Sequence, residues 1–119
     1  MDKFSDLQGK ILRRITIEDN RVFFETSNEL IYLMSHKQQC CEDVYIDDIC
    51  GKPRDILNLP ILLAEEVSNH DNPKEHDYDT DTHTWTFYKL VTMEGSLTIR
   101  WYGVSSGNYS EIVEFERIQ

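Results

Sequence analysis

The stretch "WTFYKLVTMEGSLTIRWYG", residues 85–103, decides the fold class. In its second half Leu97, Ile99 and Trp101 alternate with polar residues. In its first half the same period places one apolar face on Trp85, Phe87, Val91 and Met93. The pair Glu94–Gly95 lies between the two runs and is typical of a tight turn. A period of two on both sides of a turn predicts an antiparallel β-hairpin.

The regions around this hairpin also read as strands. "EIVEFERI", residues 111–118, is expected to be the third strand of a C-terminal meander, with Val113 and Phe115 facing inward. Upstream strands are predicted at residues 10–19, 21–26, 30–35 and 43–50. The first three of these have the spacing of a second meander, which would cover the apolar face of the first. We therefore expect one mainly β domain over residues 1–119, built as an antiparallel sandwich or a partly open barrel.

Three segments between these strands are less regular. "GKPRDILNLP", residues 51–60, allows at most one short helix near 53–59, because Pro60 ends it. "ILLAEEVS", residues 61–68, fits helix or strand, and its flanking breakers favour strand. Residues 69–83 have few apolar side chains and no period, which predicts a long acidic loop.

Composition indicates a protein that stays in the compartment where it is made. No apolar run is long enough to span a bilayer, and the polar first fourteen residues do not resemble a signal peptide. The three cysteines are an odd number, and the adjacent Cys40 and Cys41 do not form the even framework of a secreted domain. These features predict a cytoplasmic location, without a membrane contact.

Charge is the strongest compositional signal. The chain has 22 acids and 12 bases, a formal net charge of -10. Residues 42–81 alone hold 12 acids and 3 bases, so the excess is concentrated there. Such a region repels nucleic acid and attracts a basic partner, although a solvated surface without a partner is the simpler interpretation. The predicted partner-binding acids are Asp43, Asp47, Asp48, Asp71, Glu75, Asp77, Asp79 and Asp81.

Aromatic and arginine side chains offer a second binding chemistry. Arg100, Tyr102 and Tyr109 are expected on or beside the polar face of the C-terminal meander, together with Tyr88. Tyrosine and arginine are common in interaction hot spots and in stacking with ligands. Cross-strand packing that only stabilises the sheet is the alternative.

No segment carries the signature of a metal or catalytic centre. Residues 36–41 contain histidine and two cysteines, but adjacent cysteines of a strand face opposite sides and no second ligand pair exists. Residues 77–81 copy the aspartate spacing that opens an EF-hand loop, without its glycine and later glutamate. The motifs of nucleotide-binding loops, hydrolase elbows and zinc proteases are absent. We expect no metal, no cofactor and no catalytic residue.

Several blocks of the chain resemble a known family. The blocks are "CCEDVYIDDICG", "PILLAEEVS", "TWTFYKL", "IRWYG" and "FERI", and the similarity runs from Lys10 to Ile118. The family consists of small acidic proteins of unknown function from phages, prophages and mobile elements. This chain differs from it at "SHKQQ", residues 35–39, where the family has a more acidic segment. The resemblance implies a setting but no activity, so no functional residue is carried over.

Charge and resemblance together suggest a function. We expect an accessory protein of a phage or mobile element that acts stoichiometrically against host defence, in the manner of an anti-CRISPR protein. Its acidic surface would imitate nucleic acid and bind the basic groove of a host defence effector, without direct contact to nucleic acid. The alternatives are a small-ligand or nucleotide-binding sponge and a metal-binding protein or enzyme. The sequence is also compatible with a homo-oligomer.

Overall fold

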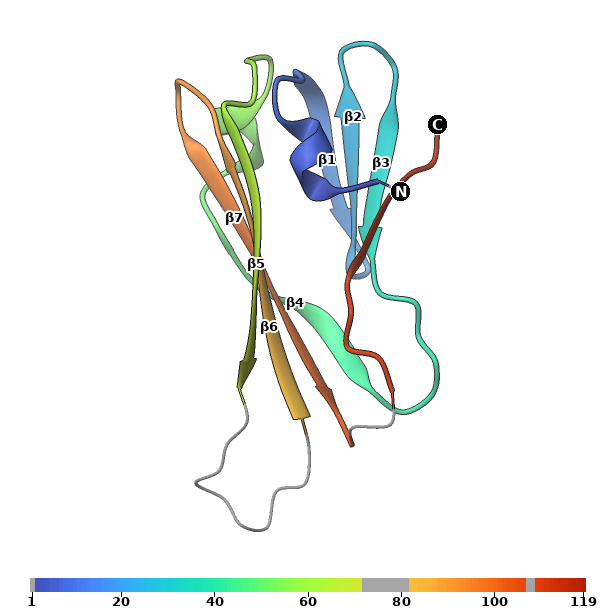
Figure 1. The fold of residues 1–119 in the computed structure, drawn as a ribbon. Coiled ribbons are helices and arrows are strands. Elements are labelled where there is room, and N and C mark those ends of the chain that lie inside the picture. The colour runs from blue at the N-terminus through green and yellow to red at the C-terminus, as the bar shows by residue number, and fades with distance from the viewer. Residues whose placement is uncertain (1, 72–81, 107–108) are drawn as a thin grey trace.

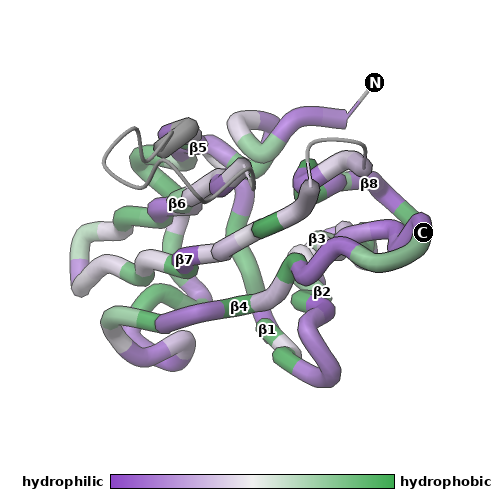
Figure 2. The backbone as a smooth tube through the Cα atoms, turned by 90° about the horizontal axis from the view of Figure 1, so that it is seen from below, coloured by the Kyte–Doolittle hydropathy of each residue, from purple (hydrophilic) through white to green (hydrophobic). Residues whose placement is uncertain are grey.

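Two four-stranded antiparallel sheets pack face to face in the computed structural model, which describes residues 2–71, 82–106 and 109–119. The first sheet has the order β1-β2-β3-β8 and contains β1 (Leu12–Glu18), β2 (Arg21–Thr26), β3 (Ile31–Ser35) and β8 (Glu114–Arg117). The second sheet has the order β4-β7-β6-β5 and contains β4 (Asp43–Cys50), β7 (Ser96–Ser105), β6 (Thr82–Val91) and β5 (Leu63–Asp71). Figure 1 shows the two layers, and Figure 2 shows the two rows of strands from below. The prediction of a mainly β sandwich is confirmed, and the sheets do not close into a barrel.

The described residues contain 3₁₀ turns but no α-helix. The turn η1 (Phe4–Leu7) precedes β1, and η2 (Pro53–Ile56) lies where a short helix was expected near residues 53–59. The segment that fitted helix or strand is the edge strand β5, as favoured. The predicted loop at residues 69–83 is shorter, because β5 extends to Asp71 and β6 begins at Thr82. Residues 72–81 lie outside the described part of the chain.

The N-terminal meander is confirmed strand by strand. Val22 pairs with Ile17 on one side and with Met34 on the other. The turn between β1 and β2 is made by Asp19 and Asn20, which both have positive φ, and these residue types adopt the left-handed conformation most readily after glycine. This arrangement brings the buried side chains of β2 and β3 to the face that meets the second sheet.

The core lies between the sheets. Trp101 of β7 is buried, and its indole N–H lies 3.1 Å from the sulfur of Met34 on β3. The alternation of Leu97, Ile99 and Trp101 into the core is therefore confirmed. Phe4 of η1 closes one side of the core by packing edge-on against Tyr88, with ring centroids 4.9 Å apart.

The prediction of a C-terminal three-stranded meander is wrong in two respects. The last strand β8 pairs with β3 rather than with β7, so the chain crosses from the second sheet to the first after β7. The inward face of β6 is also the opposite one, because Thr86, Tyr88 and Leu90 are buried while Trp85 and Phe87 face outward and are half-buried. The apolar character of the outward residues misled the assignment.

The two sheets do not match in length. Strands β5, β6 and β7 have nine or ten residues, whereas the strands of the first sheet have four to seven. The longer strands therefore extend beyond the first sheet in the lower half of Figure 1. At that end the inner face of β5 and β6 changes from apolar to polar, from Ala64 and Leu90 to Ser68 and Thr84. This polar end of the sandwich is therefore a candidate position for a binding site.

Candidate functional site

Four of the eight predicted acidic residues lie on the two edge strands of the second sheet. Asp43, Asp47 and Asp48 are exposed on the edge strand β4. Asp71 is the last residue of β5, which forms the opposite edge. Three strand spacings, roughly 14 Å, separate the backbones of the two edges. The remaining predicted acids, Glu75, Asp77, Asp79 and Asp81, lie outside the described residues.

A β-bulge brings Asp47 and Asp48 to the same side of β4. The register shifts between Ile46 and Asp48, so Asp47 is an extra residue, and Asp48 pairs with Arg100 of β7. The guanidinium of Arg100 binds Asp47 through Nε (2.8 Å to Oδ2) and through Nη2. The simple alternation that would place the two carboxylates on opposite faces fails here. Arg100 offsets part of their charge.

Aromatic rings form a row across the outer face of the second sheet. Tyr102 lies between Tyr45 and Trp85, with ring centroids 5.7 Å and 4.4 Å away. Arg100 stacks over Trp85 at 5.3 Å. The prediction that Arg100 and Tyr102 lie on the polar outer face is consistent with this placement, and Trp85 and Tyr45 join them there. Aromatic rings with an arginine and carboxylates beside them suit contact with another protein.

The other two tyrosines lie elsewhere. Tyr109 lies near Cys41 and Asp43, beside a small hollow, and does not join Arg100 and Tyr102. Tyr88 is in the core instead of on the polar face, and burial raises its pKa, with a further contribution from the nearby Glu66 carboxylate. Tyr88 is thus a packing residue whose hydroxyl reaches the polar end of the sandwich.

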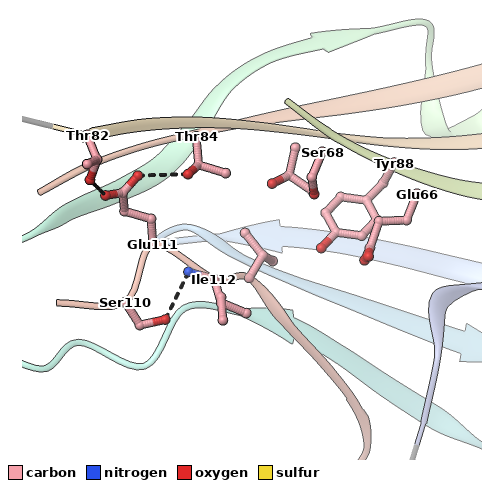
Figure 3. Close-up of a pocket in the computed structure, with 10 residues that line it drawn as sticks. Glu66, Ser68, Thr82, Thr84, Tyr88, Ser110, Glu111 and Ile112 are labelled. Atoms are coloured by element: carbon pink, nitrogen blue, oxygen red, sulfur yellow. Dashed lines mark hydrogen bonds between the residues drawn. The ribbon is translucent and has the colours of Figure 1, made fainter. Parts of the chain in front are cut away.

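An open cleft of about 660 Å³ lies between the sheets at that end. Its lining comes from β5, β6 and the segment that leads into β8, and eight of the ten lining residues have a side chain with a polar group: Glu66, Ser68, Thr82, Thr84, Thr86, Tyr88, Ser110, Glu111, Ile112 and Val113. Figure 3 shows Glu111 at one end of the cleft and Glu66 beside Tyr88 at the other, with Ser68 between them. The described lining contains two carboxylates and no lysine or arginine. Its volume is in the range of small-molecule sites.

The carboxylate of Glu111 is fixed in the cleft by hydrogen bonds to three hydroxyl groups. Thr84 Oγ1 donates to its Oε1 at 2.8 Å, and Ser105 Oγ donates to its Oε2 at 2.5 Å. Thr82 also donates to Oε2. The residue approaches β7 closely because residue 103 is glycine, whose missing side chain leaves room for it. The chain thus crosses between the sheets with a fixed carboxylate in the cleft.

A buried carboxylate, that of Glu42, organises the segment before β4. Glu42 accepts hydrogen bonds from the backbone N–H of Gln39 (2.7 Å) and Cys40 (2.9 Å) and from Nε2 of His36 (2.8 Å). Burial alone would raise the pKa of Glu42, but these hydrogen bonds outweigh it and lower the pKa to about 2. The adjacent Cys40 and Cys41 are exposed and joined by a disulfide. The sequence predicted the two cysteines on opposite faces of a strand, but the pair lies before β4.

The described part of the chain does not meet the requirements of a metal site. Within residues 2–69, 82–106 and 109–119, no three histidine, cysteine, aspartate or glutamate side chains are placed to hold an ion. The cluster of His36 and Glu42 is satisfied by its own hydrogen bonds. These residues stabilise a turn.

Sequence reasoning missed the cleft, although a signal was present. On the inner face of β5 and β6, hydroxyl and carboxyl residues replace apolar ones from Glu66 and Thr86 onward. A strand that is apolar at one end and polar at the other on the same face indicates that its cover ends midway. The position of Glu111 had no local signal, because it depends on where the chain crosses between the sheets.

The comparisons with known proteins place the chain in a family without adding an activity. No helix in the described part of the chain is long and apolar enough to cross a membrane. No curated protein and no solved structure matches the chain. One family matches residues 5–115, nearly the whole length. The chain therefore belongs to the family described as a domain of unknown function, DUF7448.

Proposed function

We propose that the chain is a non-catalytic binding protein that captures a basic protein through its second sheet. One observation carries this proposal, the unequal charge of the two sheets. The strands of the second sheet hold six acids and two bases, a formal charge of -4, whereas those of the first sheet hold four of each. The six acids are Asp43, Asp47, Asp48, Glu65, Glu66 and Asp71.

The sign of this charge determines the class of partner. Carboxylates on both edges of the sheet repel phosphates and attract lysine and arginine. The aromatic row of Tyr45, Tyr102 and Trp85, which runs from the edge strand β4 across β7 to β6, adds apolar area that a protein partner can bury. A protein whose groove normally holds nucleic acid offers the matching cations. The carboxylates would then take the place of phosphates.

The biological setting rests on the resemblance of the sequence blocks to phage and mobile-element proteins. In that setting a stoichiometric inhibitor of a host defence effector, of anti-CRISPR type and acting in the host cytoplasm, is the function that suits an acidic binding protein. The fold offers rigid strands that hold the carboxylates at fixed spacing. The proposal requires no catalytic group.

A plasmid-interference assay against a panel of CRISPR effectors tests this function. The wild type should protect the targeted plasmid, and the variant D43N/D47N/D48N should lose at least about tenfold of that protection, since three exposed charges each contribute up to about 1 kcal/mol. The matched control is E18Q/D19N/E29Q, which removes three exposed acids from the first sheet and its turns. Circular dichroism of both variants verifies that they are folded.

Two results would overturn the proposal. One is a wild type that protects no plasmid in any system of the panel. The other is equal protection by D43N/D47N/D48N and the wild type. Equal losses in both triple variants would mean that total charge, rather than the second sheet, is responsible.

The inter-sheet cleft favours a second candidate function, binding of a small ligand. Its volume suffices for one, but Glu66 and Glu111 make it a poor site for the phosphate of a nucleotide. A thermal-shift screen with cyclic and linear nucleotides tests the nucleotide sponge directly. No shift across that screen would exclude it.

A further inference from the structure

The lower half of β5 is an open sheet edge. β5 pairs with β6 on one side only. Near its start the edge is covered, because the N–H of Ala64 donates to Oε1 of Gln8 at 3.2 Å, just after η1. In an antiparallel strand every second residue points its N–H and C=O the same way, so those of Glu66 and Ser68 also point away from β6. In the described part of the chain, no hydrogen bond from outside the sheet reaches them.

The two sides of this edge differ in chemistry. On the inner side Glu66 and Ser68 project into the inter-sheet cleft, with Glu111 at its far end (Figure 3). On the outer side Val67 is 42% exposed, and its partner on β6 is the half-buried Phe87. A strand added to β5 would therefore place alternate side chains against carboxylates and against apolar groups.

We propose that the edge of β5 from Glu66 to Asp71 receives an extended segment of the basic partner, in which basic and apolar side chains alternate. This proposal rests on the proposed capture of a basic protein and names its docking mode. The basic side chains enter the cleft toward Glu66 and Glu111, where the described lining offers no competing cation. The apolar side chains lie beside Val67 and Phe87. The partner's backbone pairs with Glu66 and Ser68.

Charge complementarity selects this occupant over a second copy of the chain. The β5 strand carries Glu65, Glu66 and Asp71 and no base, so a second acidic copy brings like charges to the interface. An unprotected edge of this length is otherwise a hazard that proteins limit with charged residues. Here the acidic residues of β5 also favour a basic segment as the strand that pairs with this edge.

Fluorescence anisotropy with synthetic peptides tests the docking mode. The probe is a labelled nine-residue peptide of alternating lysine and valine, and its control has the same composition with the lysines in one block. We expect the wild type to bind the alternating peptide at least about tenfold more tightly. S68P should weaken that binding about fivefold to tenfold, because proline removes one edge N–H without removing a bond to β6.

A charge-matched pair of variants separates the cleft from general attraction. E66Q removes a carboxylate that faces the cleft, and E65Q removes its neighbour on the outer side of the same strand. E66Q should weaken the alternating peptide more than E65Q does. Thermal unfolding of each variant shows whether S68P has damaged the fold, and E66Q tests the same edge without a change in the backbone.

Three outcomes would overturn the docking mode: equal binding of both peptides, no binding of either, or equal effects of E66Q and E65Q. A dimer in light scattering that S68P abolishes would show that a second copy occupies the edge, which also overturns it. The interference assay distinguishes the two proposals. If S68P still protects the plasmid while D43N/D47N/D48N does not, the docking mode fails and the proposed function stands.

Discussion

Gly103 of β7 lies directly under Glu111, and a β-carbon built on Gly103 would come within 2.9 Å of the β-carbon of Glu111. The same added atom would lie 3.3 Å from the carbonyl oxygen of Glu111 and 3.3 Å from a methyl group of Val44. The contact is therefore with backbone and the base of a side chain, neither of which moves aside easily. This one glycine permits the chain to cross between the sheets with a carboxylate in the cleft.

Replacement of Gly103 by alanine should displace the crossing segment. We expect G103A to lower the free energy of unfolding by about 1–3 kcal/mol, the usual range for overpacking in a well-packed site. Urea denaturation measures this change. The control is G95A, where the added atom meets Asp55 at 3.3 Å, and it should cost less. Equal stability of G103A and the wild type would contradict the close contact.

Glu42 should make stability depend on acid pH. Its pKa is about 2 in the folded protein, below the ordinary value of 4.5, so its ionised form stabilises the fold above about pH 4.5. That contribution is lost as the pH falls through the folded value. The stability difference between the wild type and E42Q should therefore be largest near neutral pH and shrink toward pH 2, as measured by urea denaturation at each pH. The exposed neighbour gives the control D43N, which removes a carboxylate without breaking the hydrogen bonds of Glu42 and should cost less stability at neutral pH. A pH-independent difference for E42Q would refute the role of the charge.

The buried contact between Met34 and Trp101 should contribute a large part of the packing free energy between the two sheets. Met34 is fully buried, and M34A should cost about 2–5 kcal/mol of unfolding free energy through lost contacts and a cavity. M93A removes the same side chain at a position that is 80% exposed and should change stability by less than about 0.5 kcal/mol. Urea denaturation of both variants makes the comparison. Similar costs at both positions would contradict the assigned core.

The cysteines should differ in reactivity. Cys50 is a free, exposed thiol, whereas Cys40 and Cys41 are joined. Purified without reductant, the folded protein should take up one iodoacetamide group, and after reduction it should take up three. Intact mass spectrometry counts these additions. Three additions before reduction would show that the adjacent cysteines are free thiols in solution.

The parts of the fold that depend on local pattern could be predicted. The alternation of Leu97, Ile99 and Trp101 identified a strand and its inward face, because both faces there differ clearly in polarity. On β6 the same reasoning chose the wrong face, since Trp85 and Phe87 are apolar yet form the outer row. Tyr88 faces the core instead, where it packs against Phe4, a residue that is distant in sequence. The local pattern of β6 does not show this contact. The pairing of β8 with β3 is also non-local, and neither strand has a sequence pattern that indicates its partner.

The site was predicted less well for the same reason. Asp43, Asp47 and Asp48 were predicted as partner-binding acids, and all three are exposed on β4. The bulge that brings Asp47 and Asp48 to one side adds a residue in a way that no alternation rule shows. Glu111 was not singled out at all, because its role comes from the crossing segment and from Gly103. Polar residues on an inner strand face were the one usable sign of the cleft.

The strands of the two sheets carry unequal charge, which makes the electric field of the sandwich different on its two faces. With a formal charge of -4 on one sheet and none on the other, an approaching cationic protein exerts a torque that turns the second sheet toward it before contact. The orienting field decays over about 8 Å at physiological ionic strength. Salt should consequently slow association far more than it speeds dissociation. If the chain captures a basic protein as proposed, the neutral strands of the first sheet contribute to orientation, because the second sheet is then the more attractive side.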